Sequence, residues 1–338
     1  VMRDGDGVES PYGPYLWLDI RHLGEEHLRT KLLEVWDICR DFVGVNPAEE
    51  LIPVRPTQHY SMGGIRVNKD GQAYGLAGLF AVGEAACWDM HGFNRLGGNS
   101  LSETIVTGRV VGRRVAEYAS GTDLRSNTGH AFDALARAEQ TAAGWLARDG
   151  SGPSVYEIRD AMGEVMMHKV GIFLNADELA EAITELGQLL DDCDNAVLRC
   201  KDPGVNPELA FALRLKGMLR LAMTVAQGAQ ARTESRGAHF RTDFPLRNDR
   251  DWLNRTLVRW GADESAPSFD YEPTGLIDLP PGYRGYGADE RIEMTETLDK
   301  YNAGVVEEQA RQGRLATAEE MGTRLRRGAW QDITGQGA

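Results

Sequence analysis

The chain has 338 residues, of which 37 are basic and 51 are acidic, so its formal net charge at pH 7 is −14. This acidic balance argues against a polyanionic partner such as nucleic acid. The hydrophobic content of 42% is enough for a packed core, and the length suits about two domains of roughly 150 residues. The most apolar stretch, 74–88, is interrupted by Glu84 and is shorter than the roughly 20 residues of a membrane span, so we expect any membrane attachment to come through partners.

The four cysteines are scattered along the chain, and no two of them form a CxxC pair. They are too few for a secreted disulfide scaffold. Cys193 and Cys200 are the two nearest in sequence, but no histidine lies beside them. We therefore expect no metal or iron–sulfur site built by this chain alone.

The first segment, 1–56, opens with glycine- and proline-rich sequence. Because the chain begins at Val1 rather than at a methionine, we expect a preceding segment to be missing. Residues 25–42 then carry apolar side chains at helical spacing, which predicts one amphipathic helix. Its predicted apolar face consists of Leu28, Leu32, Val35, Ile38, Cys39 and Phe42. Pro53 and Pro56 favour an extended connector at the end of the segment.

The second segment, 57–120, has the character of a strand and helix unit. Residues 59–67 predict a strand interrupted by two glycines, 68–71 predict a turn, and 79–82 predict a short buried strand. A glycine-rich loop, 90–99, leads into a helix. Ser100 and Glu103 match the capping box that marks a helix start. The predicted apolar face of that helix consists of Ile105, Val106, Val110, Val111 and Val115.

The rest of the chain divides into a helical segment, 121–240, and a mixed segment, 241–338. Apolar residues recur at helical spacing within 158–166, 179–190 and 208–234, and the last of these helices is apolar over a wide arc. The chain then ends in a charged helical tail, in which Glu296 and Lys300 form a favourable helical pair. Taken in chain order, the segments predict an α/β plus α fold.

Residues 78–101 combine groups that suit an anionic ligand. Glu84 follows a predicted strand, Arg95 lies in the glycine-rich loop, and Ser100 begins the helix. A helix N-terminus offers free N–H groups and a positive dipole end to an anion or an electron-rich ring. The arginine fork can grip a carboxylate through two parallel bonds. His59, about 36 residues upstream of Arg95, is a second possible donor.

By pattern alone, plainer interpretations stay open. A glycine-rich loop before a capped helix is more often an ordinary turn. Arg95 could form an interdomain ion pair, and a single histidine such as His59 on a strand is usually structural. The residues themselves support an anion-binding helix terminus in an α/β domain, and no more than that.

Three segments resemble the flavoprotein subunit of succinate dehydrogenase and fumarate reductase. They are 56–65 (PTQHYSMGGI), 78–101 (with the run ACWDMHGFNRLGGNSL) and 234–245 (ESRGAHFRTDFP). They occur in the family's order and spacing, and the similarity runs from about residue 7 to about residue 286. The run around Arg95 is most similar to the menaquinone-linked fumarate reductases.

The resemblance implies a role for each matched residue. His59 and Arg95 correspond to positions that hold the carboxylates of succinate or fumarate. Glu84 corresponds to a residue that binds the adenosine side of FAD, and Ser100 and Leu101 correspond to backbone contacts with the flavin ring. The family reaction passes hydride between the flavin and the substrate, while an arginine delivers the proton.

Two departures from the family pattern limit these roles. No GxGxxG dinucleotide fingerprint occurs in the chain. The family's flavin-carrying histidine and its proton-donating arginine belong to segments that would precede Val1. We therefore expect half of a flavin site and half of a substrate site, with a missing N-terminal half of the same subunit as a partner.

The resemblance also implies a division into four parts. Residues 1–56 would end a capping domain, 57–120 would be the returning part of a Rossmann-like FAD-binding domain, 121–240 a helical domain, and 241–338 a small α+β domain with the charged tail. The implied partners are an iron–sulfur subunit and a quinone-reactive membrane anchor at the cytoplasmic face of the inner membrane. The rival hypotheses are an L-aspartate oxidase, which shares the scaffold, and a non-catalytic structural or partner-binding fragment.

Four further polar residues favour structural roles. Arg236 and His239, in the third matched segment, are expected to form a polar knot that fixes the last helical turn against the flavin domain. His91 suits a hydrogen bond that fixes its loop at least as well as a place in the substrate pocket. His168 lies among apolar residues at helical spacing, which predicts a place in the core.

Overall fold

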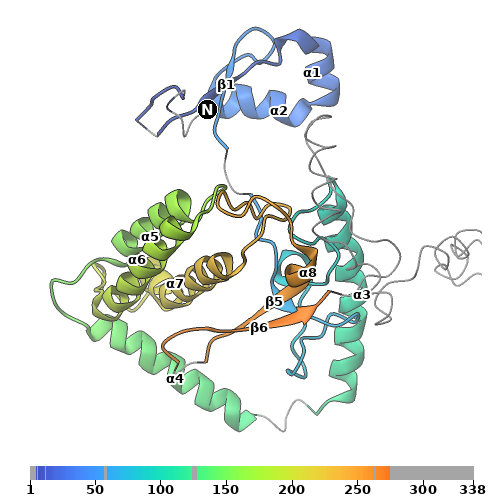
Figure 1. Cartoon of the computed structure of the whole chain (residues 1–338). Helices are drawn as coiled ribbons and strands as arrows, with labels where there is room; N and C mark the ends of the chain where they lie inside the picture. Colours follow the sequence, from blue (N-terminus) through green and yellow to red (C-terminus); the bar gives the residue numbers. More distant parts are fainter. Residues whose placement is uncertain are drawn as a thin grey trace, which may run out of the picture. The chain divides into compact units, whose positions relative to one another are not determined.

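The computed structural model describes residues 5, 7–11, 13–56, 59–123, 128–261 and 264–274. The chain separates into two compact units between Tyr60 and Ser61, and the elements of both are drawn in Figure 1. The described part is rich in helix and contains three small sheets of two strands each. The predicted charged tail, including Glu296 and Lys300, lies outside the described residues.

The first unit packs short helices beside a small antiparallel sheet. Strand β1 (Leu16–Leu18) pairs with β2 (Ile52–Val54). Between them, η1 (Arg21–Leu23), α1 (Glu25–Lys31), α2 (Leu33–Ile38) and the π-helical turn η2 (Cys39–Val43) follow one another. The predicted single helix over 25–42 is therefore divided at Leu32, whose backbone (φ −130°, ψ 39°) leaves the helical region.

The predicted apolar face of that helix is only partly right. Leu28 and Cys39 are buried as expected, but Phe42 is 85% exposed. The break after α1 rotates the following turn, so Trp36 is buried in place of its neighbours. Its ring also lies within reach of the guanidinium of Arg29, 5.4 Å from the ring centroid. The large indole offers more apolar area for burial than the smaller side chains that the spacing favoured.

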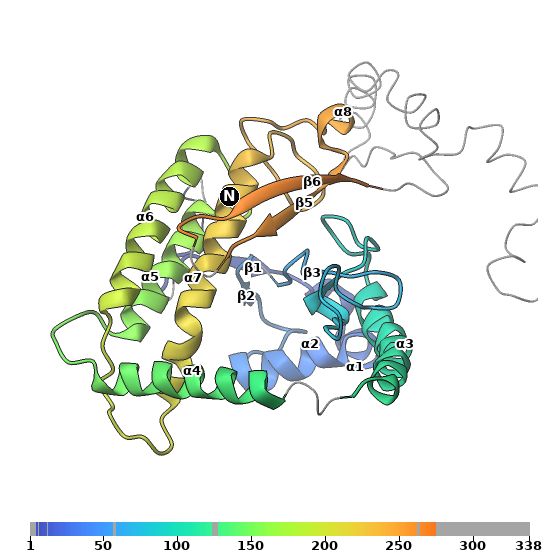
Figure 2. The same cartoon turned by 90° about the horizontal axis from the view of Figure 1, so that it is seen from below.

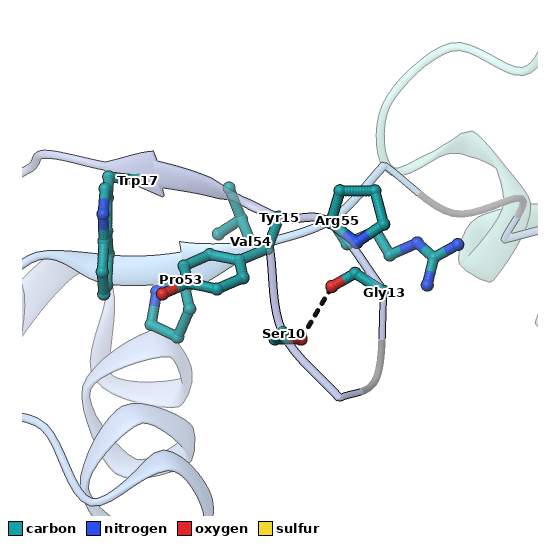
Figure 3. A pocket seen from close by; sticks show the side chains of 8 residues that line it. Ser10, Gly13, Tyr15, Trp17, Pro53, Val54 and Arg55 are labelled. Atoms are coloured by element: carbon teal, nitrogen blue, oxygen red, sulfur yellow. Dashed lines mark hydrogen bonds between the residues drawn. The ribbon is translucent and has the colours of Figure 1, made fainter. Parts of the chain in front are cut away.

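A shallow cavity of about 360 Å³ lies on the small sheet of the first unit. Figure 3 shows the rings of Tyr15, Trp17 and Pro53 along it and Arg55 at one end. The ring centroids of Tyr15 and Trp17 are 4.9 Å apart in an edge-to-face arrangement, which aromatic pairs prefer. None of the residues predicted to carry chemistry lines this cavity.

The second unit begins with a short parallel ladder and a long helix. Strand β3 (Ile65–Arg66) pairs with β4 (Ala86–Cys87), which directly follows the 3-10 turn η3 (Gly83–Ala85). Helix α3 (Asn99–Gly121) comes next. The predicted strand over 59–67 is thus reduced to two residues, because the glycines before Ile65 take positive φ angles of 119° and 126°. The strand predicted over 79–82 is wrong: only a single bridge, Gln72 to Phe80, forms there.

The predicted turn at 68–71 is confirmed. The side-chain oxygen of Asn68 accepts hydrogen bonds from the N–H groups of Asp70 and Gln72, at 2.9 and 3.1 Å. Gly71 has φ +79°, and an added Cβ would run into the side chain of Val111 on α3. The turn therefore packs directly against the helix that follows the predicted site.

Four helices form the main core of the second unit. They are α4 (Thr128–Ala147), α5 (Val155–Lys169), α6 (Ala176–Asn195) and α7 (Pro207–Ala231). Helices α5, α6 and α7 lie side by side, and α4 crosses the end of α7 (Figure 2). Helices α5, α6 and α7 all contribute side chains without exposed surface, among them Val155, Leu179, Ala182, Leu186, Leu215, Leu219 and Ala226.

The helical prediction for this region is confirmed, and the caps explain where the helices begin. Ser154 and Glu157 form a reciprocal capping box at the start of α5, and asparagine side chains cap α6 and α7. The placement of His168 in the core is wrong. Its side chain is 64% exposed and lies 3.1 Å from Glu164 one turn earlier on α5.

The described chain ends with α8 (Asp249–Trp252) and an antiparallel hairpin of β5 (Asn254–Arg259) and β6 (Ser268–Pro273). The hairpin is in register from Asn254 opposite Pro273 to Arg259 opposite Ser268. Within the described residues, no helix combines the length and apolar character that crossing a membrane requires.

Candidate functional site

The predicted site centres on the loop between β4 and α3, which carries Arg95. Helix α3 begins at Asn99, and Gly98 is its N-cap residue in the left-handed conformation (φ +77°). No side chain among the described residues caps this helix. Cβ atoms added at Gly97 and Gly98 would meet open space. The first N–H groups of a 23-residue helix therefore begin beside an accessible stretch of backbone.

The predicted capping box at Ser100 is wrong because the N-cap residue is Gly98, two residues earlier. Ser100 lies inside the helix, and the Oγ of Ser102 donates to the carbonyl of Gly98 at 3.3 Å. Glu103 is buried, and its Oε1 accepts the hydroxyl of Thr107 at 2.8 Å instead of returning to the helix start. The first turn of the helix therefore contains no carboxylate that would offset the positive end of the helix dipole.

Glu84 lies in η3, just before β4. Its Oε1 accepts the backbone N–H of Ser61 at 2.8 Å, and its side chain is exposed. The preceding residue, Gly83, has φ +67°, and an added Cβ would come within 3.0 Å of Thr104 on α3. Close packing at Gly83 therefore brings the turn that carries Glu84 against the first turns of the helix.

The five predicted site residues are divided between the two units. His59 lies in the first unit and is exposed, whereas Arg95 lies in the second unit and is half-buried. Glu84, Ser100 and Leu101 are in the same unit as Arg95, and Leu101 is 73% exposed. Convergence of His59 and Arg95 on one substrate stays a prediction.

Sequence reasoning missed a ring of four charges that holds the start of the site loop. Asp89 forms ion pairs with Arg66 at 3.2 Å and with Arg255 at 2.5 Å. Glu272 pairs with the same two arginines, with Arg66 at 3.3 Å and with Arg255 at 2.6 Å. Burial alone would raise the pKa of Glu272, but the two arginines outweigh it and lower that pKa. The ring joins β3 and the site loop to the β5–β6 hairpin.

Asp89 itself has φ +71°, a backbone conformation that residues other than glycine seldom adopt. Such strain persists where surrounding contacts over-determine the position, and it is common near functional sites. No local signal could have revealed the ring, because its members come from segments up to 206 positions apart.

The expected polar knot at Arg236 and His239 forms around a buried carboxylate. Glu234 has no exposed surface, and it accepts Arg232 at 2.6 Å, Arg236 at 2.8 and 2.9 Å, and the backbone N–H of Asn248 at 2.8 Å. Burial lowers the pKa of His239, which favours the neutral ring. The half-buried ring lies 3.3 Å from the carbonyl of Arg232, and this position within the network fits a structural role.

The Nε2 atom of His91 does not form a hydrogen bond to the neighbouring Glu103. This atom lies 4.0 Å from the Oε2 of Glu103, which is too long for a hydrogen bond. Within the described residues, both buried atoms lack a hydrogen-bond partner. The pair nevertheless places opposite charges within reach of each other whenever His91 is protonated.

No group of histidine, cysteine, aspartate or glutamate residues in the described part of the chain could hold a metal ion. Cys193 is buried and Cys200 is exposed, and both are free thiols. Burial raises the pKa of Cys193, which makes its thiolate form scarce near neutral pH.

The ion pair between Asp243 and Arg241, 2.7 Å apart, gives the stability of the protein a measurable dependence on pH. Hydrogen bonds from Arg241, with a smaller contribution from the N–H of Ala176, lower the pKa of Asp243 from 3.8 to about 2. A lowered pKa in the folded state adds stability above the unfolded value, and that stability is lost as the pH falls through the folded value.

We therefore expect Asp243→Asn to be less stable than the parent protein at pH 7. The difference should shrink as the pH falls from about 4 to about 2, where the parent carboxylate becomes protonated too. Urea unfolding at a series of pH values measures this. The exposed Asp160→Asn on α5 is the matched control, and a difference for Asp243→Asn that does not change with pH would contradict the assignment.

Comparison with known proteins assigns a class to the site region. Residues 3–101, which include Glu84, Arg95 and the start of α3, match the FAD binding domain family. Residues 159–286 match the family described as fumarate reductase flavoprotein C-term. Residues 3–101 are therefore similar to an FAD binding domain, and residues 159–286 are similar to the C-terminal part of a fumarate reductase flavoprotein.

The curated relatives narrow this class. The chain is 41% identical to the fumarate reductase flavoprotein subunit of Helicobacter pylori over 316 residues, covering 85% of this chain and 44% of that protein. It is 35% identical to the corresponding Escherichia coli subunit over 310 residues, covering 91% and 50%. The chain is a relative of the fumarate reductase flavoprotein subunits, and it spans about half the length of the curated relatives it matches.

Solved structures agree with the sequence similarity. A variant of the E. coli quinol fumarate reductase subunit FrdA matches with a TM-score of 0.75 at 34% identity, covering 83% of this chain and 48% of that one. Mycobacterium smegmatis Sdh1 in complex with UQ1 matches with a TM-score of 0.69 at 30% identity, covering 80% and 45%. The fold of the described residues is therefore that of the fumarate reductase flavoproteins.

Proposed function

We propose that these residues form part of an FAD-dependent enzyme that interconverts succinate and fumarate. The observation that carries this proposal is the match, in sequence and in fold, to fumarate reductase flavoprotein subunits. The Arg95 loop supports it, because a guanidinium lies four residues before an uncapped helix N-terminus. A dicarboxylate and an electron-rich cofactor both suit such an arrangement.

The residues around α3 fit FAD chemically. Ser100 and Leu101 lie in the first turn of an uncapped helix, beside glycine backbone that a ligand can approach closely. Glu84 offers a carboxylate acceptor, which suits the hydroxyl groups of a ribose. When bound, FAD supplies the chemistry of hydride acceptance and donation.

His59 and Arg95 would hold the two carboxylates of the substrate. The arginine fork grips one carboxylate through parallel bonds, and the imidazole donates to the other. Cationic groups fixed in advance stabilise charge that builds on a carboxylate in the transition state. This substrate role for the two residues is part of the proposal.

The proposed partners follow from the structural neighbours, one of which is a quinol–fumarate reductase with menaquinol molecules. We propose an iron–sulfur subunit and a quinone-reactive membrane anchor as partners, with the protein at the cytoplasmic face of the inner membrane. The four-part division at residues 56, 120 and 240 belongs to the same proposal.

The test uses the intact polypeptide that carries these residues, purified with its flavin. Succinate, fumarate and L-aspartate are supplied separately, and reduction or oxidation of the flavin is followed by absorbance. We expect turnover with succinate and fumarate. Turnover with aspartate alone would favour the L-aspartate oxidase hypothesis. The loop sequence NRLGGNSL at 94–101 favours succinate and fumarate as the substrates.

The hypothesis of a non-catalytic fragment has its own test. Residues 1–338 are purified alone, and their bound flavin is measured by absorbance after release. We propose that these residues by themselves bind FAD weakly or not at all, since a dinucleotide fingerprint is absent from the sequence. Tight, stoichiometric FAD in this preparation would contradict that expectation.

A further inference from the structure

Phe93 lies two residues before Arg95 and is the point where the site loop contacts the polar knot. The loop makes a tight turn here, in which the N–H of Asn94 donates to the carbonyl of His91 at 3.2 Å. Only Asn94 separates Phe93 from Arg95, so a displacement of Phe93 would also shift the backbone of Arg95.

The backbone of Phe93 is held by the turn that follows α7. The N–H of Ala238 donates to the carbonyl of Phe93 at 3.3 Å. Gly237 has φ +58°, and an added Cβ would lie 2.7 Å from the Cβ of Phe93 and 3.1 Å from its carbonyl carbon. Only a residue without a side chain allows the two backbones to approach so closely.

The ring of Phe93 is held by a second element of the same knot. The guanidinium of Arg232 lies 4.9 Å from the ring centroid of Phe93 and 4.8 Å from that of Trp252. Arg232 is buried, and it also donates to Glu234, to the carbonyls of Trp252 and Asn254, and to Thr256. A guanidinium with this many partners is a fixed surface against which the phenyl ring stacks.

We propose that Phe93 is a positioning residue, through which Gly237 and Arg232 fix the Arg95 guanidinium for dicarboxylate binding. The inference rests on the proposed function and goes further, because it assigns the third matched segment a part in substrate binding. Phe93 acts through Arg95 and does not itself touch the substrate.

The effect should be large for a residue outside the site. A misplacement of about 1 Å at a reacting group can cost roughly 10²-fold in rate. A bidentate arginine is especially sensitive, because both of its bonds depend on one orientation.

The experiment compares variants of the intact, flavin-loaded polypeptide. Phe93→Leu keeps apolar volume but removes the ring face that meets Arg232, Phe93→Tyr keeps that face, and Gly237→Ala disturbs the backbone contact. Malonate carries two carboxylates but no bond to oxidise, so its dissociation constant reports substrate binding without turnover. Gly152→Ala is the control: its added Cβ would run into the backbone of Asn195, at the opposite end of α6 from the knot.

We expect Phe93→Leu and Gly237→Ala to raise the malonate dissociation constant at least about tenfold and the KM for fumarate with it, at unchanged flavin content. Phe93→Tyr and Gly152→Ala should keep the parent value. Hydrogen exchange of the 91–97 amides should quicken in Phe93→Leu.

Unchanged malonate binding in Phe93→Leu would overturn the inference and leave the proposed function standing. If Gly237→Ala does not fold, the leucine and tyrosine pair decides alone. If the parent protein itself fails to bind malonate, fumarate and succinate, the proposed function is wrong and the inference is overturned with it.

Discussion

Replacing Arg95 with glutamine is expected to lower kcat/KM for fumarate by about 10²- to 10³-fold, which is the usual cost of removing one donor that stabilises developing charge. The change removes the only proposed guanidinium contact to a substrate carboxylate while keeping much of the side-chain volume. The measurement is steady-state kinetics of the intact enzyme with fumarate and with succinate.

Arg95→Lys should recover little of this loss, because an ammonium group cannot reproduce two parallel bonds to a planar carboxylate. Arg109→Gln is the matched control: it removes an exposed arginine from α3, in the same unit of the molecule. Equal kinetics for Arg95→Gln and Arg109→Gln would contradict the substrate role of Arg95.

Replacing Glu234 with glutamine is expected to destabilise the protein by about 3 to 5 kcal/mol, the range for a buried charge pair that loses one partner. The carboxylate has no exposed surface and compensates both Arg232 and Arg236. Glutamine presents one acceptor where Glu234 has two, so the buried Arg232 loses its counter-charge and Arg236 is left with Asp249. Urea unfolding measures the change in free energy.

The control for Glu234 is Glu185→Gln on α6, which breaks a surface ion pair with Lys169. An exposed pair of this kind contributes about 0 to 1 kcal/mol. If both variants lost similar stability, the knot would not be the structural support that its burial indicates. Because the knot also holds Phe93, Glu234→Gln should weaken malonate binding as well.

The helical core could be predicted from the sequence because its signals are local. Apolar spacing in 179–190 and in 208–234 places side chains on one face of a helix, and Ser154 and Asn206 start helices by capping them. Spacing alone was less informative where tertiary contacts decide. The helix predicted over 25–42 is interrupted at Leu32. Glu103, which the predicted capping box pairs with Ser100, is instead buried and accepts a hydrogen bond from Thr107.

The strands of the second unit were harder to predict for a related reason. The parallel pairing of Ile65 with Ala86 joins segments that are far apart in the sequence. A strand of two residues is also too short to show the alternation of apolar and polar side chains by which strands are predicted. The site residues themselves were found through family motifs. Two sets of contacts support the loop of these residues, namely Asp89 with its two arginines and Phe93 with Arg232. Neither could be predicted from local sequence, because the partners are far apart along the chain.

The charge ring at Asp89 has a consequence for biosynthesis. Arg66 and Glu272 are 206 positions apart. A ribosome that adds about 5 to 20 residues per second needs roughly 10 to 40 s to cover that interval. During this time the segment that bears Arg95 has emerged, but the hairpin that clamps it has not. The ring can therefore close only after most of the chain has been synthesised.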